Sequence, residues 1–260
     1  MERMNERLFG GGAAWTLSAL AVAAVLATIL LPAMPQPAGY LDFADRRELL
    51  GVPNFWDVMS NLPLLFIGLW GAYVVARADA RTLSQPEEKW PYAFCFGAVA
   101  LAGIGSTYFH LAPDADRLMW DRLPIALGFM ALLSAAIAER VSVRAGVQAL
   151  APLLIAGTAS VLYWRWSMLR GAENILPYAI VQFGALVALV VLAAVRSRYT
   201  RGADLFVVAG IYAAAKITEA LDQSIYTLGA ILSGHTLKHF LAAVAVWWLV
   251  RMLQRRQPAS

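Results

Sequence analysis

Apolar runs of about 20 residues recur along the whole chain and are separated by short polar loops. A helix of that length crosses the roughly 30 Å hydrocarbon core of a bilayer, because each residue advances it by about 1.5 Å. Only 15% of the residues are charged, against about a quarter in soluble domains. The sequence therefore predicts an all-α polytopic membrane protein with eight spans, over residues 13–32, 55–75, 92–110, 121–138, 147–163, 175–195, 205–221 and 235–253.

We divide the predicted fold into three parts. Residues 1–39 hold an extra N-terminal span and its linker, residues 40–253 form a seven-helix transmembrane domain, and residues 254–260 form a cytoplasmic tail. The first span could instead be a secretory signal peptide, since Arg3 and Arg7 precede its apolar run. That run is longer than a typical signal-peptide core and no clean cleavage site follows it, so we expect a retained span.

The basic residues are distributed unevenly between the two sets of loops, and this bias predicts orientation. The side that carries both termini holds thirteen of them, and the opposite side holds six. We therefore expect both termini in the cytoplasm and treat the net charge of +4 as a feature of membrane topology, with no nucleic-acid partner. Compact loops favour a bacterial plasma membrane.

The three histidines of the chain are all predicted at the outer membrane face. His110 ends the third span, and His235 and His239 begin the eighth, while Asp121 begins the fourth span on the same side. Ionisable groups in membrane spans are costly and are usually functional. Interfacial histidines without a special role are the alternative, but four such residues at one depth favour a site.

The spacing of these residues predicts a metal centre. His235 and His239 are one helical turn apart and share a face, so both imidazoles can bind one zinc ion, with His110 as a third ligand. Three protein ligands leave a position for water, whose pKa zinc lowers to about 7. Ser106 lies one turn before His110 and could stabilise an oxyanion, while Asp121 could act as general base or orient a ligand.

Three segments together resemble the alkaline ceramidase family, in particular its bacterial-type members. They are Gly-Ser-Thr-Tyr-Phe-His at 105–110, Trp-Asp-Arg-Leu-Pro at 120–124 and Gly-His-Thr-Leu-Lys-His at 234–239. The superfamily also includes adiponectin and progestin receptors and lipid hydrolases that remodel GPI anchors. Asn-Phe-Trp-Asp-Val-Met-Ser-Asn at 54–61 is similar to the segment that opens the ceramidase core, and the resemblance covers residues 40–251.

This resemblance implies a zinc-dependent intramembrane lipid amide hydrolase, most simply a ceramidase that releases a fatty acid and a long-chain amine. His110, His235 and His239 match the family's zinc ligands, and Ser106 and Asp121 match its catalytic serine and aspartate. The expected partner is a membrane lipid such as a ceramide or another N-acyl lipid. An ester hydrolase of the same superfamily and a non-catalytic lipid receptor with structural zinc remain alternatives.

The resemblance also implies a calcium site just before the core, at Asp42, Asp45 and Asn54. Oxygen ligands suit calcium, but Asn54 replaces a family glutamate and Arg47 stands where a neutral ligand is expected. A solvated loop of mixed charge is an equal alternative.

Other polar and aromatic residues receive structural predictions. We expect Lys216 and Glu219 to pair, Asp222 to reach the outer end of the site, and Ser60 and Asn61 to bond between helices. An interfacial aromatic belt is predicted at Trp15, Trp56, Trp90, Trp120, Trp164 and Trp166.

Overall fold

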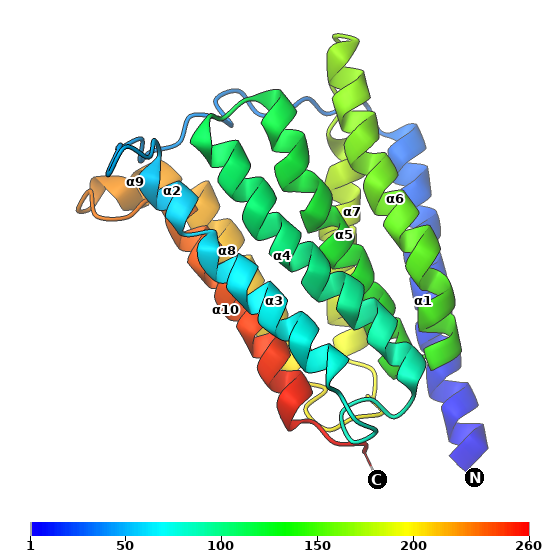
Figure 1. The fold of residues 1–260 in the computed structure, drawn as a ribbon. Helices are drawn as coiled ribbons and strands as arrows, with labels where there is room; N and C mark the ends of the chain where they lie inside the picture. The colour runs from blue at the N-terminus through cyan, green and yellow to red at the C-terminus, as the bar shows by residue number, and fades with distance from the viewer. Residues whose placement is uncertain (1, 260) are drawn as a thin grey trace.

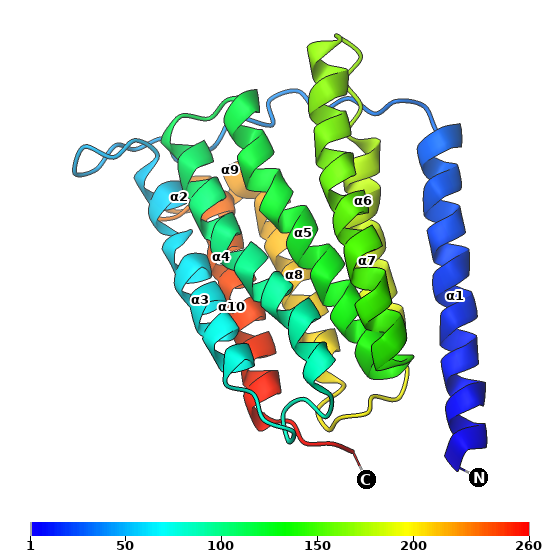
Figure 2. The same ribbon diagram turned by 45° about the vertical axis from the view of Figure 1, so that its right-hand side comes forward.

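The computed structural model describes the backbone of residues 2–259 and the side chains of residues 12–259. The described residues are helical wherever they form regular structure, and they contain no strand. The long helices run side by side in a bundle, with both termini at one end of it (Figures 1 and 2). The helices are α1 (Glu2–Leu30), α2 (Phe55–Met59), α3 (Leu62–Ala76), α4 (Lys89–Leu111), α5 (Ala115–Arg140), α6 (Val143–Leu169), α7 (Leu176–Ala193), α8 (Asp204–Ala220), α9 (Asp222–Thr227) and α10 (Gly234–Arg255).

The prediction of an all-α polytopic membrane protein is confirmed, because seven of the described helices are long and apolar enough to cross a membrane. A helix stands at each of the eight predicted positions. The predicted span that is not among these seven helices is α8. Its 17 residues extend only about 26 Å at 1.5 Å per residue. The short helix α9 follows it directly, at the end of the bundle opposite the termini (Figure 1).

The second predicted span is broken into α2 and α3 at Ser60 and Asn61. Pro63 lies in the first turn of α3 and has no N–H to donate, so the ladder of backbone hydrogen bonds cannot run through unbroken. The side chains at the break bond to the backbone instead: Ser60 Oγ and Asn61 Nδ2 both donate to the carbonyl of Asp57. This break turns Ser60 toward α10.

The helix α1 lies at the margin of the bundle. It begins earlier than predicted, at Glu2, and its contacts are with α7. Leu17 and Leu20 pack against the core, while Trp15 and Ile29 are exposed. Most of its apolar surface therefore faces outward, as expected of a helix surrounded by lipid.

A buried polar network joins the helix ends near the termini. Glu139 at the end of α5 accepts hydrogen bonds from Tyr92 of α4 and from Arg256, which follows α10. Arg140 donates from Nε to the carbonyl of Leu192 at 2.6 Å. Because these cations are paired with a carboxylate or with carbonyls, their burial is compensated, and the network fixes this end of the bundle.

One member of the predicted aromatic belt is placed differently. Trp15, Trp90, Trp120 and Trp166 are exposed as expected, but Trp164 is only 1% exposed. Its indole Nε1 donates to Glu173, and its ring packs within the bundle against Tyr178 and Ile175. The assignment of Trp164 to the belt is wrong, because this face of α6 turns toward α5 and α7.

Candidate metal centre

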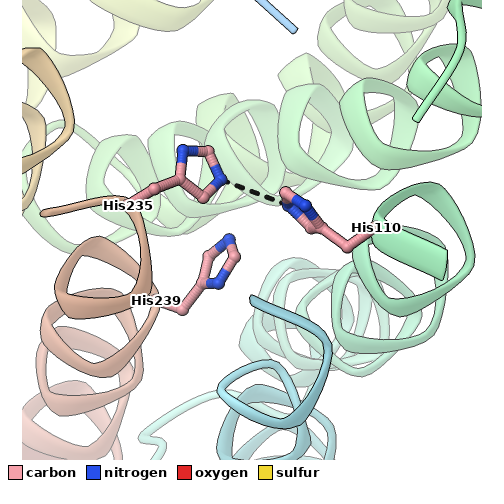
Figure 3. A group of neighbouring side chains, drawn as sticks. All are labelled: His110, His235 and His239. Atoms are coloured by element: carbon pink, nitrogen blue, oxygen red, sulfur yellow. Dashed lines mark hydrogen bonds between the residues drawn. The ribbon is translucent and has the colours of Figure 1, made fainter. Parts of the chain in front are cut away.

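The three histidines meet at the end of the bundle opposite the termini. His110 comes from the last turn of α4, and His235 and His239 come from the first two turns of α10. All three are buried, and their ligand atoms lie within 4.8 Å of one another. Figure 3 shows the imidazoles pointing toward a common centre. The predicted convergence of these residues from two distant helices is confirmed, and the group could hold a metal ion.

Two glycines permit the close helix contacts that bring the ligands together. A Cβ on Gly105 of α4 would stand 2.2 Å from the carbonyl oxygen of Trp120 in α5. A Cβ on Gly234 would stand 2.1 Å from the carbonyl oxygen of Thr218 in α8. Because real side chains never approach so closely, only glycine allows these contacts, which lie beside Ser106 and His235.

The ring nitrogens fit a metal ion. His110 Nε2 and His235 Nε2 are 3.2 Å apart, close to the roughly 3.3 Å that separates two nitrogens bound to tetrahedral zinc at about 2.05 Å. His239 Nε2 has no hydrogen-bond partner among the described residues. Buried polar atoms are normally satisfied, so this unpaired nitrogen beside the two other imidazoles suits a bound cation.

Ser60 fixes the orientation of the His239 ring. Its oxygen lies 2.7 Å from His239 Nδ1, and its own hydrogen points to the Asp57 carbonyl. The serine oxygen can therefore accept the Nδ1–H, which leaves the lone pair of this imidazole on Nε2, facing the other histidines. Partners of this kind set the tautomer of metal-binding histidines. The prediction that Ser60 bonds between helices is confirmed, whereas Asn61 bonds to Asp57 within its own segment.

Two carboxylates hold the first turn of α10 in place. Asp222 accepts from the backbone N–H of His235 at 2.7 Å and from that of Ala44 at 2.9 Å. Asp57 is fully buried and accepts from Thr236 Oγ1 at 2.6 Å. Asp222 thereby satisfies one of the free N–H groups at the N-terminus of α10, while Asp57 holds the side chain of Thr236 in the same turn. The expectation that Asp222 reaches the site is confirmed, while Asp57 had been given no role.

Ser106 and Asp121 lie at the site on adjacent helices. The Ser106 hydroxyl of α4 stands beside the Asp121 carboxylate of α5, and both side chains are buried. They line the same cavity as His239. The structure therefore brings the predicted serine and aspartate together next to one of the predicted metal ligands.

Lys238 is a second residue of the site that had been left without a role. Its Nζ lies 3.0 Å from His235 Nε2 and 2.9 Å from Glu219 Oε1. Glu219 also pairs with Lys216, as predicted. The signal in the sequence was the spacing, because Lys238 follows His235 by three residues and so lies on the same side of the helix.

A cavity of about 330 Å³ extends from this site into the bundle. Its polar end includes Ser106, Asp121, Glu219, Lys238 and His239. The rest is lined mainly by apolar side chains, and on α8 the lining runs from Glu219 back to Leu205. The 14-residue step from Leu205 to Glu219 corresponds to about 21 Å of helix. The cavity is therefore longer than the roughly 15 Å depth of the hydrocarbon core in one leaflet.

Phe43, in the segment between α1 and α2, covers two of the histidines. Its ring centroid lies 4.5 Å from that of His235 and 4.8 Å from that of His110. The segment is held by the bond from Ala44 to Asp222. An aromatic ring in this position restricts the access of bulk water to the ligands.

The predicted calcium residues are engaged with other partners. Asp42 pairs with Arg46 at 2.8 Å, and both oxygens of Asp45 accept from Arg47. Burial raises the pKa of Asp45, but the hydrogen bonds and charge of Arg47 outweigh it and hold that pKa below its usual value. Asn54 Nδ2 donates to the carbonyl of His110 at 2.9 Å. These contacts stabilise the loop beside the site, and calcium binding stays a prediction.

Searches against protein-family models and against curated proteins gave no match for this chain.

Proposed function

We propose that this protein is a zinc-dependent intramembrane hydrolase that cleaves the amide bond of an N-acyl lipid. One observation carries the proposal: three buried imidazoles converge, and one of them, His239, lines the polar end of a long apolar cavity together with Ser106 and Asp121. Three protein ligands leave the fourth position open for water, which is the pattern of catalytic zinc, whereas structural zinc is usually held by four protein ligands. The resemblance of the motifs around His110, Asp121 and His235 to alkaline ceramidases supports the same activity.

The cavity provides the binding site for the acyl chain. Its apolar lining extends from the polar end toward Leu205 of α8 and Leu249 of α10. An acyl chain buried there would leave its carbonyl group at the polar end, beside His239. Binding in this register determines which bond of the lipid meets the reactive groups.

His110, His235 and His239 would hold the zinc ion, through nitrogens that include the unpaired Nε2 of His239. When bound, zinc supplies Lewis acidity, which activates water and polarises a carbonyl group. Ser60 keeps Nε2 of His239 free for this role, and Phe43 limits the entry of further water.

Asp121 transfers the proton in the proposed reaction, and Ser106 stabilises the negative charge that develops on the carbonyl oxygen. Asp121 takes a proton from the attacking water while the water oxygen forms a bond to the carbonyl carbon. The hydroxyl of Ser106 donates to the carbonyl oxygen as negative charge develops on it. The carbon–nitrogen bond then breaks, and Asp121 returns the proton to the departing nitrogen, so that water and amide yield a fatty acid and an amine.

The basic residues of the loops support an orientation with both termini in the cytoplasm. In that orientation the histidines lie toward the outer face of the membrane, within reach of outer-leaflet lipids. The compact loops favour a bacterial plasma membrane.

The test uses the purified chain with ceramides, other N-acyl lipids and glycerol esters, with and without a chelator. Release of fatty acid from an amide substrate, lost with the chelator and restored by zinc, is the expected result. Release from esters alone would redirect the proposal to an ester hydrolase. Zinc binding without turnover of any lipid would favour a receptor.

A further inference from the structure

Arg122 is a buried cation at the polar end of the cavity that the proposed reaction does not use. It follows Asp121 in α5, its residue is 2% exposed, and it lines the same cavity as Asp121 and Ser106. A cation within a membrane protein is costly unless other groups compensate its charge. The contacts of Arg122 therefore show what it is placed to bind.

Three aromatic rings surround the guanidinium of Arg122. Its central carbon lies 4.1 Å from the ring centroid of Trp164, 5.2 Å from that of Tyr178 and 5.3 Å from that of Tyr40. Aromatic faces attract a cation and hold its plane in a fixed position. They do not accept its N–H hydrogen bonds as an oxygen would. The rings therefore orient the group and leave its donors to be satisfied by something else.

The donors of Arg122 are largely without partners. Nη2 donates to Gln36, whereas Nε and Nη1 have no hydrogen-bond partner among the described residues. The other arginines buried in the bundle behave differently, because Arg140 and Arg256 both pair with Glu139. No carboxylate forms an ion pair with Arg122 in the described part of the chain.

The other cations at the polar end of the cavity already have a carboxylate partner, because Lys216 and Lys238 both pair with Glu219. Arg122 has no such partner among the described residues, so it is the cation placed to receive a further negative charge.

We infer that Arg122 binds an oxyanion on the head group of the lipid. This inference rests on the proposed function and narrows its substrate class to N-acyl lipids with a carboxylate or phosphate next to the amide, such as N-acyl amino acids. A guanidinium suits both anions, because it offers several planar donors to their oxygens. A neutral ceramide would leave Nε and Nη1 of Arg122 buried and unpaired, at a cost in binding.

The experiment compares four palmitoyl lipids on the purified full chain. N-palmitoylglycine carries a carboxylate and N-palmitoylethanolamine phosphate carries a phosphate, while N-palmitoylethanolamine and palmitoyl ceramide are neutral. We expect the wild type to have a higher kcat/KM for at least one anionic lipid. Arg122→Gln should lower that kcat/KM about 10- to 100-fold and should not lower the kcat/KM of the neutral lipids. The relative rates of the carboxylate and the phosphate then identify the anion.

Two further variants separate recognition from folding. Arg165→Gln removes an arginine of α6 that pairs with the exposed Asp116, and it should change no substrate preference. Arg122→Lys keeps the charge but not the planar donors, and its loss should be smaller than that of Arg122→Gln. If Arg122→Gln does not yield folded protein with zinc, Arg122→Lys provides the comparison. Equal losses for anionic and neutral lipids, or a wild-type preference for neutral ones, would overturn the inference.

Direct binding of radiolabelled lipid keeps this result separate from the proposed activity. If N-palmitoylglycine binds the wild type more tightly than N-palmitoylethanolamine and Arg122→Gln removes the difference, the anion site stands even when no lipid is hydrolysed. If hydrolysis occurs and both lipids bind the wild type equally, the hydrolase proposal stands and the anion site is wrong.

Discussion

Ser60→Ala is expected to weaken zinc binding without unfolding the protein. Ser60 is completely buried, and its oxygen lies 2.7 Å from His239 Nδ1. Without the serine oxygen, His239 Nδ1 has no hydrogen-bond partner. The imidazole of His239 can then carry its proton on Nε2, the nitrogen that would bind the metal. Removal of a partner that orients a histidine ligand typically lowers metal affinity by about 10- to 100-fold. That factor corresponds to about 1.4–2.8 kcal/mol, within the usual cost of about 1–3 kcal/mol for an unpaired buried donor.

Competition against a chromophoric chelator measures the zinc affinity of the purified variant. Ser134→Ala is the matched control, because Ser134 is equally buried but donates to the carbonyl of Gly146, away from the histidines. We expect the control to bind zinc as the wild type does. If Ser60→Ala stays within about twofold of the wild type, or if both variants weaken equally, the orienting role of Ser60 is wrong.

Three other predictions address the remaining charged groups. Asp121→Asn should retain zinc but lower turnover about 10²- to 10⁴-fold, as measured by fatty acid release, and unchanged turnover would exclude it as the base. Glu219→Gln leaves Lys238 without its carboxylate partner beside His235, so zinc affinity should fall, by about tenfold in the same chelator assay. Arg47 lowers the pKa of Asp45 in the folded protein below its value of about 3.8 in the unfolded chain. The ion pair therefore contributes its full stabilisation above the unfolded pKa, and that stabilisation is lost as the pH falls through the folded pKa. Thermal unfolding should therefore show Asp45→Asn below the wild type at pH 6 and the gap closing toward pH 3, and a gap independent of pH would contradict this.

The apolar runs predicted most of the fold, because membrane spans depend on composition and length more than on tertiary contacts. The boundaries of α7 and α10 lie within about two residues of their predictions. The break between α2 and α3 was missed, although Pro63 was visible in the sequence. Proline is tolerated within many membrane helices, so its presence alone does not predict a break.

The ligands were predictable because histidine is rare in this chain and two of the three are one turn apart. The residues that orient them were not, because their roles depend on three-dimensional neighbours. Asp57 and Ser60 act on α10 from 176 or more residues away in sequence. Trp164 likewise resembles an interfacial tryptophan until its position beside Arg122 is known.

The most direct test of the central claim is the zinc content of the purified chain, determined by elemental analysis. The account predicts about one zinc ion per chain, and its loss in the double variant His235→Ala/His239→Ala with the helical fold retained. Full zinc content in that folded double variant would show that the imidazoles of α4 and α10 do not form the metal site.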